Sequence, residues 1–187
     1  MTGRRDEIVE AALAVIRESG LAAFTQPRVA RRTGLRQSHL TYYFPTRDEL
    51  LVAVAHEAVR QRLVALGPVG TAPTAEAKVA ALAAVLVAPE QTRVLLALTQ
   101  SADVVPDVRI AMVELGRGLV PLAASLLTAA GAEVAPATLD TLQSTSTGIA
   151  VLALAQGGEA FRQRAEAALT ALLHGLAVTN PLREARP

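Results

Sequence analysis

The chain has 187 residues, 51% of them hydrophobic, and a formal net charge of +1, so it is long enough to bury a substantial core. It has no cysteine, and its three histidines lack the spacing of metal ligands, which argues against disulfides, a metal site or a cofactor. The charged N-terminus is unlike a secretory signal. No stretch reaches about 18 apolar residues without a charged residue or a proline, so the sequence does not predict a membrane-spanning helix. We therefore expect a cytoplasmic protein that makes no contact with a membrane.

Positive charge and aromatic residues are concentrated near the N-terminus. Residues 1–47 contain eight arginines and four acidic residues, a balance of +4, whereas residues 48–187 have a balance of −3. Four of the five aromatic residues lie between Phe24 and Phe44. A local basic surface is what the neutralisation of phosphates requires, so this part of the chain is a candidate for nucleic-acid binding.

The first four helices are predicted by hydrophobic periodicity and by their capping residues. The Thr25 hydroxyl can cap a helix, Gly34 allows a tight turn after it, and Pro45 ends the next helix. Thr46 and Glu49 have the spacing of a capping box. These signals predict helices at about 4–19, 26–33 and 37–43, and a fourth helix that begins after Thr46.

Prolines and glycines divide the remaining sequence, which is rich in alanine and leucine, into further helices. We expect a loop or a connection at the edge of a domain at 67–73, a kink or break at Pro121, and a frayed segment at 180–187. The predicted fold is all-α, with about nine helices. The later ones are expected at about 74–88, 90–102, 106–130, 137–156 and 159–178.

Residues 24–45 have the pattern of a helix-turn-helix. Val29, Leu35 and Leu40 can form a small core, Ala30 lets two helices cross closely, and Gly34 forms the turn. The helix after the turn can then enter the major groove and contact base edges, while other polar residues bind phosphates. The open alternative is a helical hairpin whose aromatic residues only pack and whose arginines are only solvated. The DNA-binding candidates are Thr25, Gln26, Arg28, Arg36, Gln37, Ser38, His39, Tyr42, Tyr43 and Arg47.

This segment resembles the DNA-binding domain of the TetR family of transcriptional regulators. The resemblance rests on Ile8, Ala11 and Ala12, on the pairs Phe24-Thr25, Val29-Ala30 and Gly34-Leu35, and most of all on LTYYFPTRDEL at 40–50. Thr41, Arg47, Arg36 and Arg28 depart from residues that are common in the family. We expect these departures to change the DNA sequence that is bound more than the ability to bind DNA.

The resemblance implies a helix-turn-helix domain at 1–47 and a helical effector-binding and dimerisation domain at 48–187. In such a homodimer the last two long helices form a four-helix bundle with the partner. The alternative is that these apolar stripes pack within the monomer. The candidate interface residues are Leu142, Ile149, Leu152, Leu169, Leu172, Leu173 and Leu176.

The resemblance also implies an effector pocket between about residues 74 and 130. The candidate lining residues are Leu82, Leu86, Leu95, Leu98, Met112, Leu115 and Leu119, each of which could equally be ordinary core. No polar constellation identifies the ligand. The scarcity of aromatic residues after Phe44 disfavours a stacking cage, so the small-molecule effector is expected to be modest in size and apolar.

The resemblance thus implies a dimeric repressor that binds a pseudo-palindromic operator and is released by a small molecule. A ligand that shifts the spacing of the two DNA-reading heads through the fourth helix would achieve this release. The alternatives are a constitutive DNA-binding regulator, a helical scaffold, and a ligand carrier or enzyme. An enzyme is the least supported, because the sequence has no recognisable nucleophile–base arrangement, phosphate-binding glycine loop or paired acids on one helix face.

Overall fold

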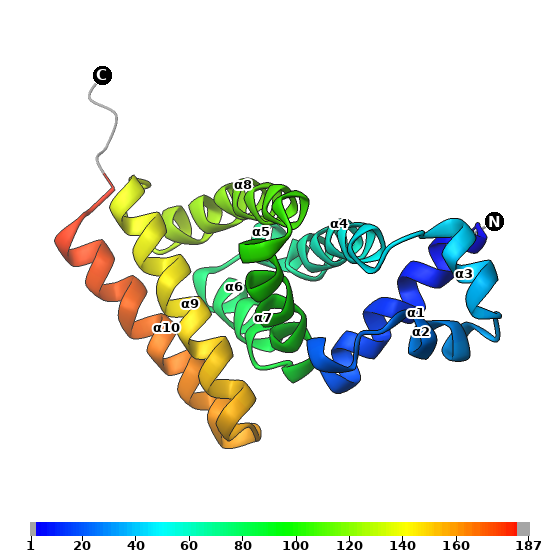
Figure 1. The fold of residues 1–187 in the computed structure, drawn as a ribbon. Coiled ribbons are helices and arrows are strands. Elements are labelled where there is room, and N and C mark those ends of the chain that lie inside the picture. Colours follow the sequence, from blue (N-terminus) through cyan, green and yellow to red (C-terminus); the bar gives the residue numbers. More distant parts are fainter. Residues whose placement is uncertain (1–2, 183–187) are drawn as a thin grey trace. The chain divides into compact units, whose positions relative to one another are not determined.

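The computed structural model describes residues 3–182, and these form an all-α fold (Figure 1). The β pairing among them is a single antiparallel bridge between Ala132 and Pro181. Each helix that the sequence predicts is present. The elements are α1 (Arg4–Ser19), the 3-10 helix η1 (Leu21–Ala23), α2 (Gln26–Thr33), α3 (Gln37–Tyr43), α4 (Arg47–Ala65), α5 (Gly67–Thr71), α6 (Ala75–Leu86), α7 (Pro89–Val104), α8 (Pro106–Ala129), α9 (Pro136–Gln156) and α10 (Glu159–Thr179).

The chain forms two compact units. Unit 1 comprises residues 1–62 and 93–116, and unit 2 comprises residues 63–92 and 117–187. The divisions fall inside α4, α7 and α8. The boundary expected between residues 47 and 48 separates a DNA-binding domain from an effector-binding and dimerisation domain, and the compact units do not test it, so it stays a prediction. Residues 1–2 and 183–187, the outer ends of those two domains, lie outside the described residues.

The core of unit 1 forms where the N-terminal helices pack together. Its largest fully buried side chains are aromatic or aliphatic, and their burial supplies the main stabilising free energy of these short helices. Half of the capping box expected at Thr46 is present, because the Glu49 amide donates to Thr46 Oγ1 over 3.1 Å. The Glu49 carboxylate accepts from the Thr46 hydroxyl over 3.0 Å, in place of the bond from the Thr46 amide that a full capping box has. The core side chains from α1 to α4 include Ile8, Leu13, Ile16, Phe24, Leu40, Phe44, Leu50 and Leu51.

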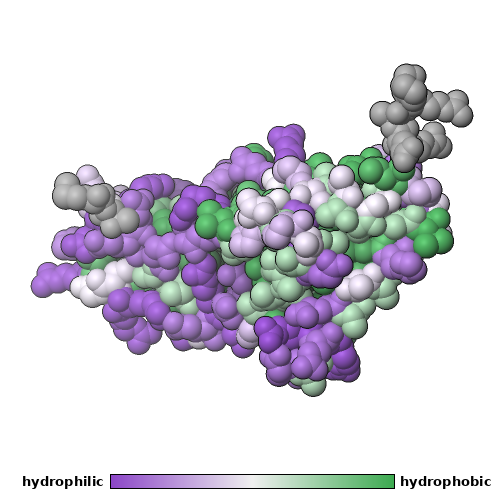
Figure 2. All heavy atoms as spheres, turned by 180° about the vertical axis from the view of Figure 1, so that it is seen from behind, coloured by the Kyte–Doolittle hydropathy of each residue, from purple (hydrophilic) through white to green (hydrophobic). Residues whose placement is uncertain are grey.

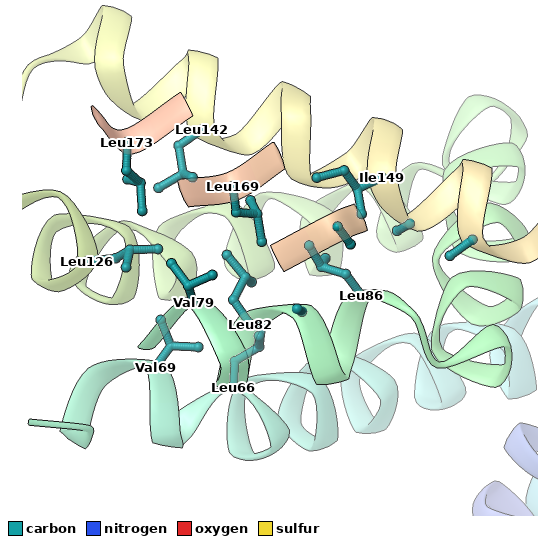
Figure 3. Close-up of a cluster of buried hydrophobic side chains, with 14 of the residues drawn as sticks. Leu66, Val69, Val79, Leu82, Leu86, Leu126, Leu142, Ile149, Leu169 and Leu173 are labelled. Carbon is teal, nitrogen blue, oxygen red and sulfur yellow. The ribbon is translucent and has the colours of Figure 1, made fainter. Parts of the chain in front are cut away.

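The core of unit 2 is aliphatic apart from Phe161. Residues of α6, α9 and α10 converge on it, and Figure 3 shows Val79, Leu82 and Leu86 of α6 facing this cluster. Four of the interface candidates lie in the same cluster: Leu142, Ile149, Leu169 and Leu173. Because side chains of their own chain cover these four, packing within the monomer explains them.

A short helix, α5, occupies most of the segment that the sequence predicts as a loop. Pro68 is tolerated there because it lies in the first turn, where a backbone N–H has no helical partner. The buried ammonium of Lys78 donates to the carbonyls of Val69 and Gly70 and to Ser125 Oγ, each over 2.9 Å. These bonds hold the end of α5 against α6 and α8, so the loop prediction for 67–71 is wrong.

Helix α8 continues through Pro121 as one element, so the proline does not split it. By length and composition alone, with a mean hydropathy of 1.6 over 18 residues, α8 could span a membrane. The core helix of a soluble protein meets the same criterion, and Leu126 and Leu127 are fully buried in unit 2. One such helix is therefore weak support for a membrane span.

The first residues of the segment expected to fray are held by backbone hydrogen bonds. The Glu133 amide donates to the Asn180 carbonyl over 2.8 Å, and the Leu182 amide donates to the Gly131 carbonyl over 2.9 Å. The prediction of fraying is therefore wrong for 180–182, and its remainder, 183–187, lies outside the described residues.

The hydropathy of the surface differs between parts of the chain. Figure 2 shows one face, on which hydrophilic residues dominate the part that carries the N-terminus and hydrophobic residues gather near the C-terminal end. Exposed large hydrophobic residues of unit 2 include Val151 and Leu152 on α9 and Val178 on α10. Single exposed apolar side chains are ordinary, but several on two packed helices indicate a surface that a partner could cover.

Candidate nucleic-acid interface

Helices α2 and α3 form the helix-turn-helix that the sequence predicts. Thr25 Oγ1 accepts a hydrogen bond from the Arg28 amide, which caps α2 at its start. Gly34 ends α2 with φ of +67°, in the left-handed region that glycine adopts at little cost. The Leu35 amide then donates to the Ala30 carbonyl over 2.9 Å, so the turn has the hydrogen bonding of a helix C-cap.

A small core fixes α3 against α2. Val29 and Leu40 have no exposed surface, and Ala30 is 3% exposed, as expected where two helices cross closely. Leu35 is only half-buried. Because Leu40 is the buried residue of α3, the rest of this helix faces outward or sits at its edge.

The start of α3 presents polar side chains that the protein itself does not use. Arg36, Gln37, Ser38 and His39 are exposed, and within residues 3–182 none of their side chains is hydrogen-bonded. Tyr42, one turn further on, is 82% exposed, and its ring meets the Tyr43 ring edge-on. These groups are free to contact a ligand on the outer side of α3.

Other predicted DNA contacts are engaged within unit 1. Gln26 Nε2 donates to the Phe44 carbonyl over 2.8 Å, and Arg28 Nη2 donates to Ser19 Oγ over 2.8 Å. Arg47 Nε donates to the Phe24 carbonyl over 3.2 Å, and its guanidinium lies 5.1 Å from the centre of the Phe24 ring. These side chains hold the helix-turn-helix together, whether or not they also meet phosphates.

Two arginines that the sequence analysis did not select contribute to this region. Arg5 Nη1 donates to the Tyr43 carbonyl over 3.2 Å, and the Arg5 guanidinium lies 4.3 Å from the centre of the Phe44 ring. Arg31 is exposed and has no ion pair or side-chain hydrogen bond among residues 3–182. The excess of basic residues before residue 48 could have drawn attention to both arginines. Only the fold of residues 3–182 shows that Arg5 is bound to the protein and that Arg31 is not.

One acid of unit 1, Glu18, is paired with an arginine. Arg32 makes two bonds of 2.7 Å to the carboxylate of Glu18, and this pairing holds the pKa of Glu18 below its ordinary value. At neutral pH Glu18 is therefore a paired anion and repels a phosphate less than a free carboxylate would.

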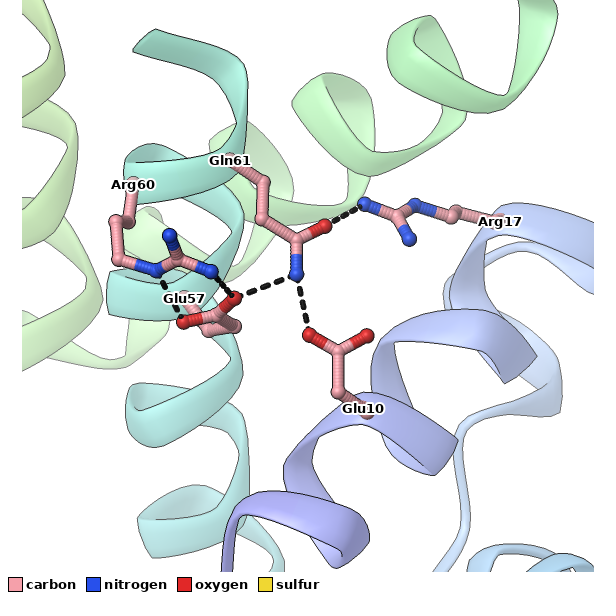
Figure 4. Close-up of polar contacts among 5 residues, drawn as sticks. All are labelled: Glu10, Arg17, Glu57, Arg60 and Gln61. Carbon is pink, nitrogen blue, oxygen red and sulfur yellow. Dashed lines mark hydrogen bonds and ion pairs between the residues drawn. The ribbon is translucent and has the colours of Figure 1, made fainter. Parts of the chain in front are cut away.

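A polar network joins α1 to α4 within unit 1 (Figure 4). Gln61 is its centre: the amide nitrogen donates to Glu10 and Glu57, and the amide oxygen accepts from Arg17. Arg60 also binds Glu57 and, as the largest cause, lowers the pKa of that carboxyl to about 2. Arg93 of α7 donates to the Arg17 carbonyl over 3.0 Å. Helices α1, α4 and α7 are thus tied together by side chains.

The residues proposed for an effector pocket are divided between the two units. Leu95, Leu98, Met112 and Leu115 belong to unit 1, where Leu98 and Leu115 are buried. Leu82, Leu86 and Leu119 belong to unit 2 and lie in or against its core. Ordinary core packing, the alternative left open by the sequence, accounts for the buried ones.

The remaining interface candidates lie toward the surface of unit 2. Leu152 of α9 is 51% exposed, and Leu172 and Leu176 of α10 are partly buried. The exposed residues beside Leu152 include Gly148 and Val151. Any contact with a partner through α9 therefore involves this outward face.

Comparison with known proteins identifies the N-terminal domain. Residues 8–54 match the model of the bacterial regulatory proteins, tetR family. No curated protein matches the sequence. The matched residues include α2, α3 and the start of α4, which are the elements of the geometry above.

Solved structures share the fold along nearly the whole chain. A transcriptional regulator from Rhodococcus sp. Rha1 superposes with a TM-score of 0.83 at 19% identity, covering 97% of this chain and 100% of that one. A TetR transcription regulator from Haloarcula marismortui gives a TM-score of 0.74 at 17% identity, covering 92% and 97%. The multidrug binding protein EbrR, solved with proflavin, gives 0.66 at 23% identity, covering 91% and 99%. Residues 8–54 of this chain therefore match the tetR family of bacterial regulatory proteins, and the described residues as a whole have the all-α fold of the solved regulators.

Proposed function

We propose that this protein is a transcription regulator that reads double-stranded DNA with α3. The observation that supports this most is the set of exposed polar side chains at the start of α3, none of which is used within residues 3–182. A short helix held firmly by Val29 and Leu40 is the element that enters the major groove in helix-turn-helix proteins.

In this proposal different residues have different roles. Gln37 and His39 carry both donors and acceptors, and Arg36 carries donors, so they can read base edges. Tyr42 and Arg31 are proposed phosphate ligands, because each is exposed at the basic surface. Gln26, Arg28 and Arg47 mainly preserve the geometry of the motif, since each already has an internal partner.

Selection of bound sequences from a random pool of double-stranded DNA tests the proposal. We expect the full-length protein to enrich two inverted half-sites whose centres lie about 34–36 Å apart along the duplex. Its affinity should fall as salt rises, because phosphate contacts release counterions. No enrichment above non-specific binding would contradict the proposal.

Single substitutions test the assignment of roles. Gln37→Ala or His39→Ala should lose about 1–3 kcal/mol of discrimination at one base pair of the selected site. Tyr42→Phe removes one hydroxyl and should weaken binding to all sequences alike. Gln100→Ala, an exposed change on α7, is the control and should leave DNA binding unchanged. Unaltered preference in both α3 variants would contradict base reading by this helix.

We further propose a homodimer that joins the outward faces of α9 and α10. The support is the exposed apolar and small residues there, among them Gly148 and Leu152 of α9 and Ala171, Gly175 and Val178 of α10. Small side chains allow two helices to approach closely, and a two-fold axis matches a pseudo-palindromic operator. A DNA-binding regulator of this kind acts in the cytoplasm and needs no cofactor.

The regulatory outcome that we propose is repression relieved by a small molecule. EbrR, a structural neighbour, is a multidrug binding protein whose structure was solved in complex with proflavin, so this fold accommodates a small ligand in that protein. Titrating DNA-bound protein with metabolites tests the proposal, because an effector should weaken operator affinity by roughly 5- to 150-fold. An affinity that no bound molecule changes would favour a constitutive regulator.

A further inference from the structure

Arg62 of α4 is a buried cation without a partner. Its side chain is 9% exposed, and its Nη1 is fully buried with no hydrogen bond. Within residues 3–182 no carboxylate forms an ion pair with it. Burial lowers the pKa of Arg62, yet a guanidinium stays protonated in proteins, so the charge remains. An unpaired buried charge is among the most destabilising arrangements in a protein.

The other buried cation among residues 3–182, Lys78, shows what a structural role looks like. Lys78 is 6% exposed, and its ammonium donates to three oxygens, all at 2.9 Å. Arg17 also has a buried Nε without a partner, but its Nη2 is bonded to Gln61. Arg62 lacks any such contact, so packing and hydrogen bonding inside the protein do not account for it.

The core of unit 1, the unit to which Arg62 belongs, is largely apolar. Ala58 and Val59, which precede it by one turn on α4, are buried. The buried side chains that α7 and α8 contribute to unit 1 are aliphatic apart from Ser101, whose hydroxyl donates to the Ala97 carbonyl. A buried charge attracts a group of opposite charge more strongly than an exposed one, because less solvent screens it.

We propose that Arg62 binds the anionic oxygen group, carboxylate or phosphate, of a small effector. A guanidinium matches either group with two parallel hydrogen bonds, which would give the buried Nη1 a partner. A cationic molecule would be repelled, and a neutral one would leave the charge unpaired. This inference rests on the proposed function, since it names the chemical class of the effector.

Thermal unfolding and calorimetric titration of the full-length protein without DNA test the inference. The probes are octanoate, benzoate and inorganic phosphate, with octanol and octylammonium as the neutral and cationic counterparts of octanoate. We expect at least one anion to raise the Tm of the wild type, and octylammonium to leave it unchanged. Arg62→Met should raise the Tm of the free protein and weaken binding of that anion at least tenfold.

Arg117→Met is the matched control, because it removes an exposed arginine that has no ion pair or side-chain hydrogen bond among residues 3–182. It should respond to the anion as the wild type does. If none of the three anions stabilises the wild type more than Arg62→Met, the inference is overturned. Operator binding is measured separately, for the wild type and for Arg62→Met. A wild type that binds no operator would overturn the proposed function, whatever the anions do.

Discussion

Gly34 is the residue on which the angle between α2 and α3 depends most directly. Its φ of +67° suits glycine, and a methyl group added there would meet no atom within 4 Å. Any cost of a larger residue therefore comes from the backbone alone. An L-residue in this conformation loses about 1–2 kcal/mol relative to glycine.

We expect Gly34→Ala to lower the free energy of unfolding by about 1–2 kcal/mol, because alanine is strained at this positive φ. Operator binding should weaken too, because the strained turn changes the angle between α2 and α3. Urea denaturation and gel shift measure the two effects. Gly116→Ala is the control: this glycine lies inside α8 with open space around it, so the change should stabilise the protein by about 0.5–1 kcal/mol. Equal effects of the two variants would contradict a special role for Gly34.

Glu57 gives the network around Gln61 a dependence on pH. The pKa of Glu57 is lowered from 4.5 to about 2, first by its bond to Arg60. A lowered pKa stabilises the folded state at pH above the ordinary value, and the contribution is lost as the pH falls through about 2. Because Arg60 is 64% exposed, solvent screens the pair, and we expect the contribution to be about 1 kcal/mol.

Between pH 5 and pH 2 the wild type should therefore lose about 1 kcal/mol more unfolding free energy than Glu57→Gln. Urea denaturation at several pH values measures this difference. Arg60→Met removes the same interaction and should reproduce the flatter pH dependence. Parallel curves for the wild type and both variants would show that the pair does not stabilise the fold.

Capping residues of the helix-turn-helix could be found from the sequence, whereas its long-range contacts could not. Thr25 and Gly34 act on a backbone only a few residues away, so local spacing reveals them. Arg5 reaches Tyr43, and nothing in the spacing of these two residues indicates the contact. The burial of Arg62 was likewise hidden, because an arginine on a helix is ordinarily expected to reach solvent.

Among the helices, α5 depends most on a single side chain outside it. Two of its last three carbonyls accept from the Lys78 ammonium, which takes the place of a helix C-cap. Lys78→Met would leave the Val69 carbonyl without this donor, in a buried position. An unsatisfied buried carbonyl costs about 1–3 kcal/mol.

We therefore expect Lys78→Met to lower the free energy of unfolding by about 1–3 kcal/mol, as measured by denaturation. Ser125→Ala removes a weaker contact to the Gly70 carbonyl and should cost less. A Lys78→Met protein as stable as the wild type would mean that the free energy of burying the ammonium cancels the stabilisation by its hydrogen bonds.

The sequence predicted the long helices well but could not assign their faces. Residues 67–71 contain two glycines and a proline, which favour a loop, yet Pro68 also suits the first turn of a helix. Leu142 and Leu169 have the periodicity of an apolar stripe, and a stripe that faces its own core looks like one that faces a partner. Only the fold decides between them.

Leu152 of α9 lies in the proposed dimer interface, so its substitution tests the assembly of the whole molecule. We expect Leu152→Glu to produce monomers in sedimentation equilibrium, because an unpaired charge in an apolar interface is costly, and operator affinity should fall with the dimer. Helix content measured by circular dichroism should not change, since this side chain is 51% exposed in the single chain. Ile110→Glu, an equally drastic change at a 55% exposed position of α8, is the control. A dimer that survives Leu152→Glu would place the interface elsewhere.

Lys78 is also the single lysine of the chain. Because its amine is enclosed and bonded to three oxygens, amine-directed reagents should leave Lys78 of the folded protein unmodified. Cleavage after Lys78 by a lysine-specific protease requires that α5, α6 and α8 first come apart. The rate of that single cut would therefore report how often unit 2 opens, without any label or engineered probe.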